Sequence, residues 1–279
     1  MRLRAQTIIT AASVAYVSLL ALVACATPAP PSAAAPAASP GVSPTEPAPA
    51  VLRAFAENGG AGCPAPALPP LEQLEPNASL PDPFLSSKGR RITTQAEWTC
   101  RRAEIAAQVF WRVSQAQMDA YRATVNPNPK GGQGIQTLAS AAGEQPWFRA
   151  SFGQFGKSTE TVQRLPFDQH LVLGLVAPRA LFVLDNTDMM WLGDESSFTS
   201  SVASAEIWKA LGASGAMAAS QMGGHPHCTE VPQVQLDELG AFVDKFLLGA
   251  QAAPDNVLRS DRIAPDRARW IPWGTPALK

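Results

Sequence analysis

The feature that most constrains the fold is a largely apolar segment that ends in a glycine pair and leads into two histidines. Residues 215–222 form this segment, and residues 223–228 read Gly-Gly-His-Pro-His-Cys. An apolar run that stops at turn residues is typical of a buried parallel strand. An amphipathic pattern at 236–248, ending at Gly249, predicts a helix after the histidines. The sequence therefore predicts a strand that delivers histidines to the edge of a sheet.

A second apolar run, residues 180–184, ends at Asp185 and precedes a helical pattern at 198–211 that stops at Gly212. The order helix, strand, helix, strand, helix indicates α/β layering with a parallel sheet. Only two or three strands are visible, so the sheet is expected to have exposed edges. We predict further helices at 94–121, 136–142 and 167–177, and a short strand at 91–93.

The first 62 residues predict export rather than fold. Residues 1–24 have the basic start and apolar stretch of a signal peptide. The sequence Leu-Val-Ala-Cys that ends at Cys25 resembles a bacterial lipobox, in which Cys25 would carry the lipid; an ordinary signal peptide with a chance cysteine is the alternative. Residues 25–62 predict a Pro/Ala-rich tether. The protein is expected in the bacterial cell envelope, lipid-anchored at the membrane, or in the periplasm or secreted.

The remaining chain is expected to form one domain, residues 63–250, followed by a C-terminal tail, residues 251–279. A net charge of −1 without a basic patch gives no reason to expect nucleic acid as a partner. Export places the cysteines in an oxidising compartment. We expect a disulfide between Cys63 and Cys100, which leaves Cys228 unpaired. A monomer is expected.

Motifs spread over most of residues 63–249 resemble the glucuronoyl esterases, carbohydrate esterase family 15. In the N-terminal part, Leu80–Phe84 resembles the family's entry motif, and Glu97-Trp-Thr-Cys100-Arg-Arg lies on its first helix. The resemblance continues in a series of later segments. These are Gly143–Phe148, Leu165–His170, Ala177–Leu181, Asp185-Asn186, Trp191–Gly193, Gly223–Cys228 and Phe242–Leu247.

The resemblance implies an α/β-hydrolase-like three-layer fold from which a large segment is missing. In the family, strands and a Gly-Cys-Ser-Arg-Asn-Gly-Lys-Gly nucleophile elbow follow the first helix. Here residues 101–108 run directly into Val109–Ser114, which resembles text beyond the elbow, and no Gly-x-Ser-x-Gly occurs in the chain. We therefore expect a truncated fold without the first half of the sheet. Three other serines lack the glycine-flanked turn that exposes a nucleophile: Ser114, Ser151 and Ser220.

By the same resemblance, His227 matches the catalytic base, which would take the serine proton and return it to the leaving alcohol. His225 is expected to be structural, and the close His-Pro-His-Cys spacing has poor geometry for a metal. The residues that match the sugar-binding positions are Gln136, Glu144 and Trp191. Asp185 and Asp188 are alternative candidates for the acid, and simple turn formation is the competing interpretation.

The complete enzyme would hydrolyse esters between 4-O-methyl-glucuronate on xylan and lignin alcohols through an acyl-enzyme, without a metal or an organic cofactor. Glucuronoxylan or glucuronate esters are the expected ligands. This chain is expected to be inactive as an esterase because the serine is absent. The alternatives are a non-catalytic carbohydrate-binding surface lipoprotein and the product of a pseudogene or an incomplete gene.

Overall fold

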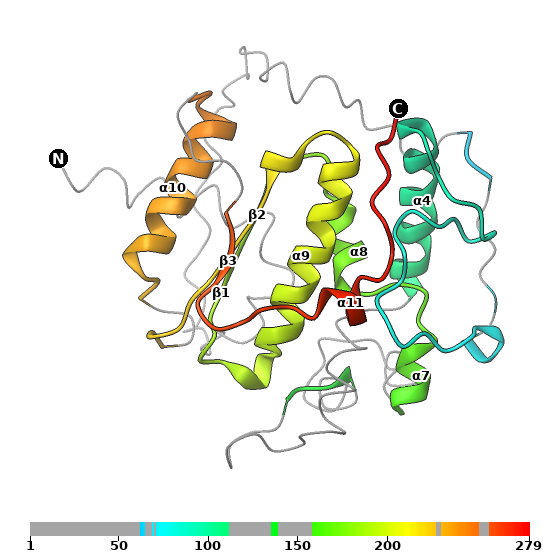
Figure 1. The fold of residues 1–279 in the computed structure, drawn as a ribbon, viewed down its shortest axis with the longest axis horizontal. Helices are drawn as coiled ribbons and strands as arrows, with labels where there is room; N and C mark the ends of the chain where they lie inside the picture. The colour runs from blue at the N-terminus through cyan, green and yellow to red at the C-terminus, as the bar shows by residue number, and fades with distance from the viewer. Residues whose placement is uncertain are drawn as a thin grey trace, which may run out of the picture. The chain divides into compact units, whose positions relative to one another are not determined.

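The computed structural model divides the chain into two compact units, Met1–Pro47 and Ala48–Lys279. The residues that it describes all lie in the second unit (Figure 1). They are 62–64, 69, 71–111, 135–138, 158–226, 230–250 and 257–279. Within these residues no helix is both long and apolar enough to cross a membrane.

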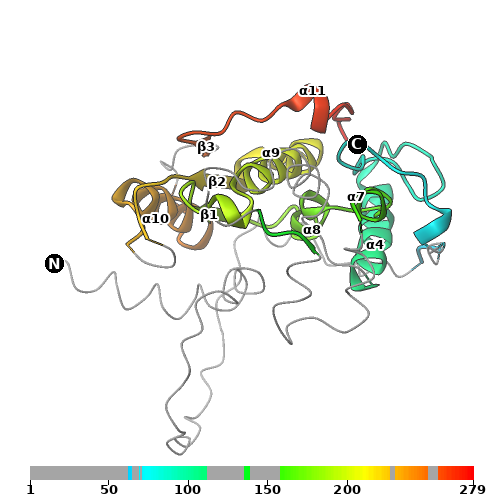
Figure 2. The same ribbon diagram turned by 90° about the horizontal axis from the view of Figure 1, so that it is seen from below.

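The centre of this unit is a parallel sheet with the strand order β1-β2-β3. The strands are β1 (Leu181–Asp185), β2 (Met217–Gln221) and β3 (Leu258–Ser260). Helix α9 (Asp194–Ala210) joins β1 to β2, and α10 (Gln233–Leu247) follows β2. The two helices lie on opposite faces of the sheet (Figures 1 and 2). This is the α/β layering that the sequence predicts.

The alternating side chains of β1 pack against the two helical layers. The Phe182 ring lies edge-on to Phe242 of α10, with 5.2 Å between centroids. Leu181 and Val183 pack instead against the main hydrophobic core, which includes Ile207 and Trp208 of α9. All five residues of β2 are buried, as expected for the middle strand of a covered parallel sheet.

Beyond α9 the core continues to α8 (Gln169–Gly174) and α4 (Gln95–Trp111). Gly174 permits a close helix approach, because a Cβ there would lie 2.5 Å from Cδ1 of Ile207. The helix predicted at 167–177 is shorter in the structure, because Asp168 caps its start and its side chain accepts from the Gln169 N–H. Helix α9 starts four residues before the predicted position 198, because Gly193 turns the chain at φ 76° directly before it. The short helical elements are η2 (Leu71–Gln73), α7 (Thr159–Gln163), η5 (Met190–Leu192), η6 (Ser214–Ala216) and α11 (Arg267–Trp270).

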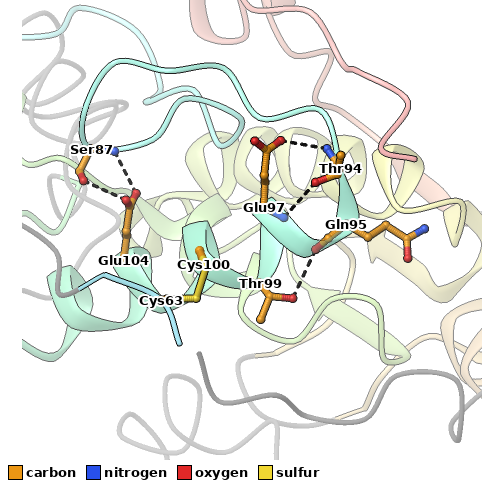
Figure 3. Close-up of a disulfide and its surroundings, with 8 residues drawn as sticks. All are labelled: Cys63, Ser87, Thr94, Gln95, Glu97, Thr99, Cys100 and Glu104. Atoms are coloured by element: carbon orange, nitrogen blue, oxygen red, sulfur yellow. Dashed lines mark hydrogen bonds between the residues drawn. A yellow bond between two sulfur atoms is a disulfide. The ribbon is translucent and has the colours of Figure 1, made fainter. Parts of the chain in front are cut away.

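Helix α4 begins at Gln95, at the boundary predicted from the sequence, and its first turn is closed by reciprocal bonds (Figure 3). The Glu97 N–H donates to Thr94 Oγ1 at 3.1 Å, and the Thr94 N–H donates to the Glu97 carboxylate at 3.2 Å. A disulfide joins Cys100 on this helix to Cys63. The predicted strand at 91–93 is reduced to one bridge, between Leu85 and Arg91.

The segment expected as a C-terminal tail is instead part of the fold. Described residues 257–279 supply β3 and α11, and they bury Trp270, Ile271 and Leu278. The Leu278 N–H donates to the Ala210 carbonyl at the end of α9. Strand β3 is only three residues long and carries no hydrophobic alternation, so its pairing depends on the open edge of β2 rather than on its own pattern.

Candidate functional site

Three loops meet where the parallel strands end. They are residues 186–189 after β1, residues 222–226 after β2, and residues 261–262 after β3. Ligand sites of open α/β sheets lie at this carboxyl edge. The Thr187 N–H donates to the Met222 carbonyl at 3.4 Å, and the Asn186 side chain donates to the His225 carbonyl at 2.9 Å. The first two loops are therefore directly connected.

Asp185, the first acid candidate, is turned toward the sheet. Its carboxylate accepts from Gln221 Nε2 at 3.1 Å and from the Asn186 N–H at 2.8 Å. Gln221 is buried and also donates to the Asp194 carbonyl at the start of α9. Burial raises the pKa of Asp185, although hydrogen bonds from Ser197, Asn186 and Gln221 oppose the shift. This carboxyl group joins the ends of β1 and β2.

Asp188, the second acid candidate, contacts the histidine-bearing loop. Its Oδ2 accepts a hydrogen bond from the Gly224 N–H, and its Oδ1 lies 2.6 Å from the Arg262 guanidinium. The backbone bond from Gly224 and the cation of Arg262 lower the pKa of Asp188, so this group is a carboxylate over a wide pH range. Of the two candidates, Asp188 is the one at the edge where the loops meet.

His225 is held by its own loop. Its Nε2 lies 3.2 Å from the Met222 carbonyl, and its Nδ1 lies 3.1 Å from the Pro226 carbonyl and 3.4 Å from Asn186 Nδ2. These backbone contacts fit the structural role expected for His225. The predicted base His227 and the predicted unpaired Cys228 lie outside the described residues.

Two of the three predicted sugar-binding residues are neighbours. The Gln136 N–H donates to the Trp191 carbonyl at 2.8 Å. Trp191 lies in η5, three residues after Asp188, so the same connection carries the acid candidate and the indole. Glu144 and the lipidation candidate Cys25 lie outside the described residues. Gln136 and Trp191 are far apart in the sequence, and one backbone hydrogen bond joins them after β1.

Ser220 is not an exposed nucleophile. It lies in β2 with 0% of its surface exposed, and its hydroxyl makes no hydrogen bond within the described part of the chain. Ser114 and Ser151 fall outside the described residues. Among the residues that the structure places, no group of three His, Cys, Asp or Glu side chains converges as metal ligands would.

Sequence reasoning missed Asp261 and Arg262, which come from the expected tail. Asp261 accepts hydrogen bonds from Thr187 Oγ1 at 2.8 Å and from the Gly223 N–H at 2.9 Å. Arg262 forms the ion pair with Asp188. The only signal in the sequence was the charged pair Asp261-Arg262 itself, and such pairs are common in loops.

The fold is that of an α/β hydrolase, as solved structures show. The glucuronoyl esterase catalytic domain from Hypocrea jecorina superposes with a TM-score of 0.63 at 21% identity, covering 76% of this chain and 100% of that one. The glucuronoyl esterase from Sporotrichum thermophile gives a TM-score of 0.62 at 20% identity, with 74% and 98% covered. At these identities the likeness establishes the fold.

Sequence comparison finds part of the chain similar to glucuronoyl esterases. A family model described as "Glucuronyl esterase, fungi" matches residues 107–212. The 4-O-methyl-glucuronoyl methylesterase of Hypocrea jecorina is 43% identical over 147 residues, which are 53% of this chain and 30% of that protein. The enzyme of the same name from Cerrena unicolor is 34% identical over 172 residues, 60% of this chain and 33% of its own length. The chain thus spans about a third of the curated relatives that it matches.

Proposed function

We propose that this chain binds glucuronate or its esters at the edge formed by the loops after β1 and β2, and that it does not hydrolyse them by a serine route. The observation that carries the proposal is the bond between the Gln136 N–H and the Trp191 carbonyl, which joins two predicted sugar-contacting residues on the connection that also carries Asp188. The relatives that match part of this chain are named 4-O-methyl-glucuronoyl methylesterases.

The chemistry of the retained residues suits a sugar acid. An indole ring packs on the apolar face of a pyranose, and its N–H donates to a hydroxyl. The amide of Gln136 and the predicted contribution of Glu144 supply acceptors and donors for ring hydroxyls. By resemblance, His227 matches the base of the complete enzymes. Binding needs these groups alone, and it does not need the nucleophile.

Hydrolysis through an acyl-enzyme needs a serine whose hydroxyl attacks the ester carbonyl while a histidine takes its proton. No Gly-x-Ser-x-Gly occurs in the sequence, and the Ser220 hydroxyl is buried in β2. The first covalent step therefore has no nucleophile. The segment expected to be missing where residues 101–108 run into Val109 would account for this loss.

The binding test uses methyl 4-O-methyl-glucuronate, the ester class present in the solved complex of a Sporotrichum thermophile glucuronoyl esterase mutant. Isothermal titration with the full chain should give saturable binding, and Trp191→Ala should weaken it about tenfold or more, a loss of about 1.4 kcal/mol. Gln136→Ala should also weaken binding, whereas its matched control Gln163→Ala, on α7, should leave the affinity unchanged. Absence of saturable binding, or equal effects of the two glutamine variants, would refute the proposal.

We also propose that the chain is exported and anchored through a lipid on Cys25. The support is the signal-like sequence of residues 1–24 and the Leu-Val-Ala-Cys that ends it. Mass spectrometry of the mature protein from a bacterial host should show a diacylglycerol-modified N-terminal Cys25. Cys25→Ser should remove the modification and release the protein from the membrane fraction. Cleavage elsewhere without lipid would contradict the anchor.

A further inference from the structure

The turn after β3 contacts both loops of the candidate site. The two carboxylate oxygens of Asp261 are used separately: one accepts from Thr187 Oγ1 at 2.8 Å and the other from the Gly223 N–H at 2.9 Å. The Asp261 N–H itself donates to the Gln221 carbonyl at the end of β2. Asp261 therefore connects the loop after β1, the loop after β2 and the sheet.

The next residue, Arg262, acts on the same loops through Asp188. The guanidinium lies 2.6 Å from Asp188 Oδ1, while Asp188 Oδ2 accepts from the Gly224 N–H. Two consecutive amides, those of Gly223 and Gly224, are thus bound by carboxylates from two different segments. Both Asp188 oxygens are engaged, one by the Gly224 N–H of the loop and the other by the Arg262 side chain.

The packing at Gly223 shows how closely this arrangement is fitted. A Cβ at this position would lie 2.7 Å from Thr187 Oγ1, 2.7 Å from Arg262 Nη2 and 2.8 Å from Asp188 Oδ1. A side chain at this position would force these three side-chain ends to move, so glycine lets them close around the loop. Gly224 follows with φ 86°, which turns the chain toward His225.

We propose that Asp261 and Arg262 are positioning residues that fix the loop carrying His225 against the end of β1. The inference rests on the proposed function, because a fixed loop is useful only if this edge binds a ligand. Charge-assisted hydrogen bonds to backbone amides are stronger than neutral ones, so Asp261 carries the larger effect. The Arg262–Asp188 pair is half-exposed on the arginine side and carries the smaller one.

Amide hydrogen exchange of Gly223 and Gly224, measured by NMR on the full chain without ligand, tests the proposal. Asp261→Ala should speed exchange at Gly223 by about tenfold or more, as expected for loss of a bond to a charged acceptor. Asp261→Asn keeps one acceptor oxygen and should give an intermediate rate. Arg262→Gln should speed exchange at Gly224 by about two- to threefold. Amides of β2 should keep their protection.

Matched controls lie on the same segment. Asp266 accepts from the Arg269 N–H at the start of α11, and asparagine caps a helix as well as aspartate does, so Asp266→Asn removes a charge without touching the loops. Arg267 is exposed like Arg262, 50% against 51%, and pairs with Glu206 of α9. Arg267→Gln and Asp266→Asn should leave the exchange of both glycines unchanged.

A second readout separates positioning from general stability. The chain contains three histidines, so the ¹⁵N imidazole spectrum is simple to assign with His225→Asn and His170→Gln. Asp261→Ala should change the His225 signals, which report its contact with the Met222 carbonyl, and Asp266→Asn should not. Unchanged Gly223 exchange in Asp261→Ala, or equal acceleration of the β2 amides, overturns the proposal. Because no sugar is present, failure of ligand binding would refute only the proposed function.

Discussion

The Gly224 N–H donates a hydrogen bond to the Asp188 carboxylate, and this bond joins the loop after β1 to the loop after β2. Asp188 also pairs with Arg262, so one exposed carboxylate connects all three strand ends. Asp185, three residues earlier, is directed to Gln221 and the sheet. The two acid candidates therefore have different roles despite their closeness in sequence.

The first prediction concerns the titration of Asp188. The Gly224 amide proton shift should follow the protonation of Asp188, with a midpoint below the ordinary 3.8 because the Gly224 N–H and Arg262 favour the carboxylate. A depressed pKa in the fold means that the stabilisation is present above the midpoint and is lost as the pH falls through it. Arg262→Gln should move the midpoint upward. A midpoint at or above 3.8 in the unaltered chain would contradict the contact.

The second prediction concerns His170, which is fully buried with Nε2 2.8 Å from the Pro81 carbonyl and its ring stacked on Trp273. Burial lowers the pKa of His170 to about 4, and the Pro81 carbonyl only partly opposes this. The unfolded chain takes up the proton near pH 6.5, and the folded chain does not. The contribution of His170 to the free energy of unfolding is therefore fully present above about pH 6.5 and falls as the pH drops toward 4. The loss is about 3 kcal/mol.

Chemical denaturation between pH 4 and pH 7 measures this slope, and His170→Gln should largely remove it. Glutamine can still donate to the Pro81 carbonyl and does not titrate. Equal slopes in the two proteins would show that other groups determine the acid sensitivity.

The third prediction concerns the disulfide between Cys63 and Cys100, which are 37 positions apart. Closing a loop of this size stabilises the fold by about 3–4 kcal/mol in the chain-entropy model. Cys100→Ser should lower the midpoint of denaturation accordingly, while Cys228→Ser should have little effect because Cys228 is predicted to be unpaired. Non-reducing peptide mapping that places Cys228 in a bridge with Cys63 or Cys100 would overturn the assignment.

The fourth prediction concerns Trp270 of the C-terminal segment. Its side chain is 4% exposed and packs in a cluster with Leu80 and Ala203. Trp270→Ala should destabilise the fold by about 3–5 kcal/mol, as large-to-small core changes do. Leu248→Ala, at a side chain that is 75% exposed, is the control and should cost less than about 0.5 kcal/mol. If the two variants melt alike, the C-terminal segment is not part of the cooperative core.

The sequence predicts the elements with strong periodicity and misses those without it. Strands β1 and β2 lie where the apolar runs predict them, and α10 begins three residues earlier than its amphipathic stretch, at Gln233. Strand β3 has three residues, among them Arg259, which pairs with Glu238 of α10. Its position is set by the edge of β2, and no local pattern encodes that edge.

The candidate site was predictable to the level of segments. The glycine-histidine turn and the Asp185–Asp188 stretch indicate the carboxyl edge of the sheet, and the structure brings them together. The direction of each side chain depends on its tertiary partners. Asp185 ends β1 and contacts Gln221 of the neighbouring strand, whereas Asp188 lies in the following turn and contacts Gly224. The contribution of Asp261 depends on the path of the C-terminal segment, which is not visible from residue types.

The most direct test of the central claim is proton NMR of methyl 4-O-methyl-glucuronate mixed with the protein, because one sample reports both binding and methanol release. We predict saturation transfer from the protein to the sugar protons, greatly reduced in Trp191→Ala, with methanol released at the buffer rate. Methanol release well above buffer that His227→Ala abolishes would contradict it, and so would the absence of saturation transfer to the sugar.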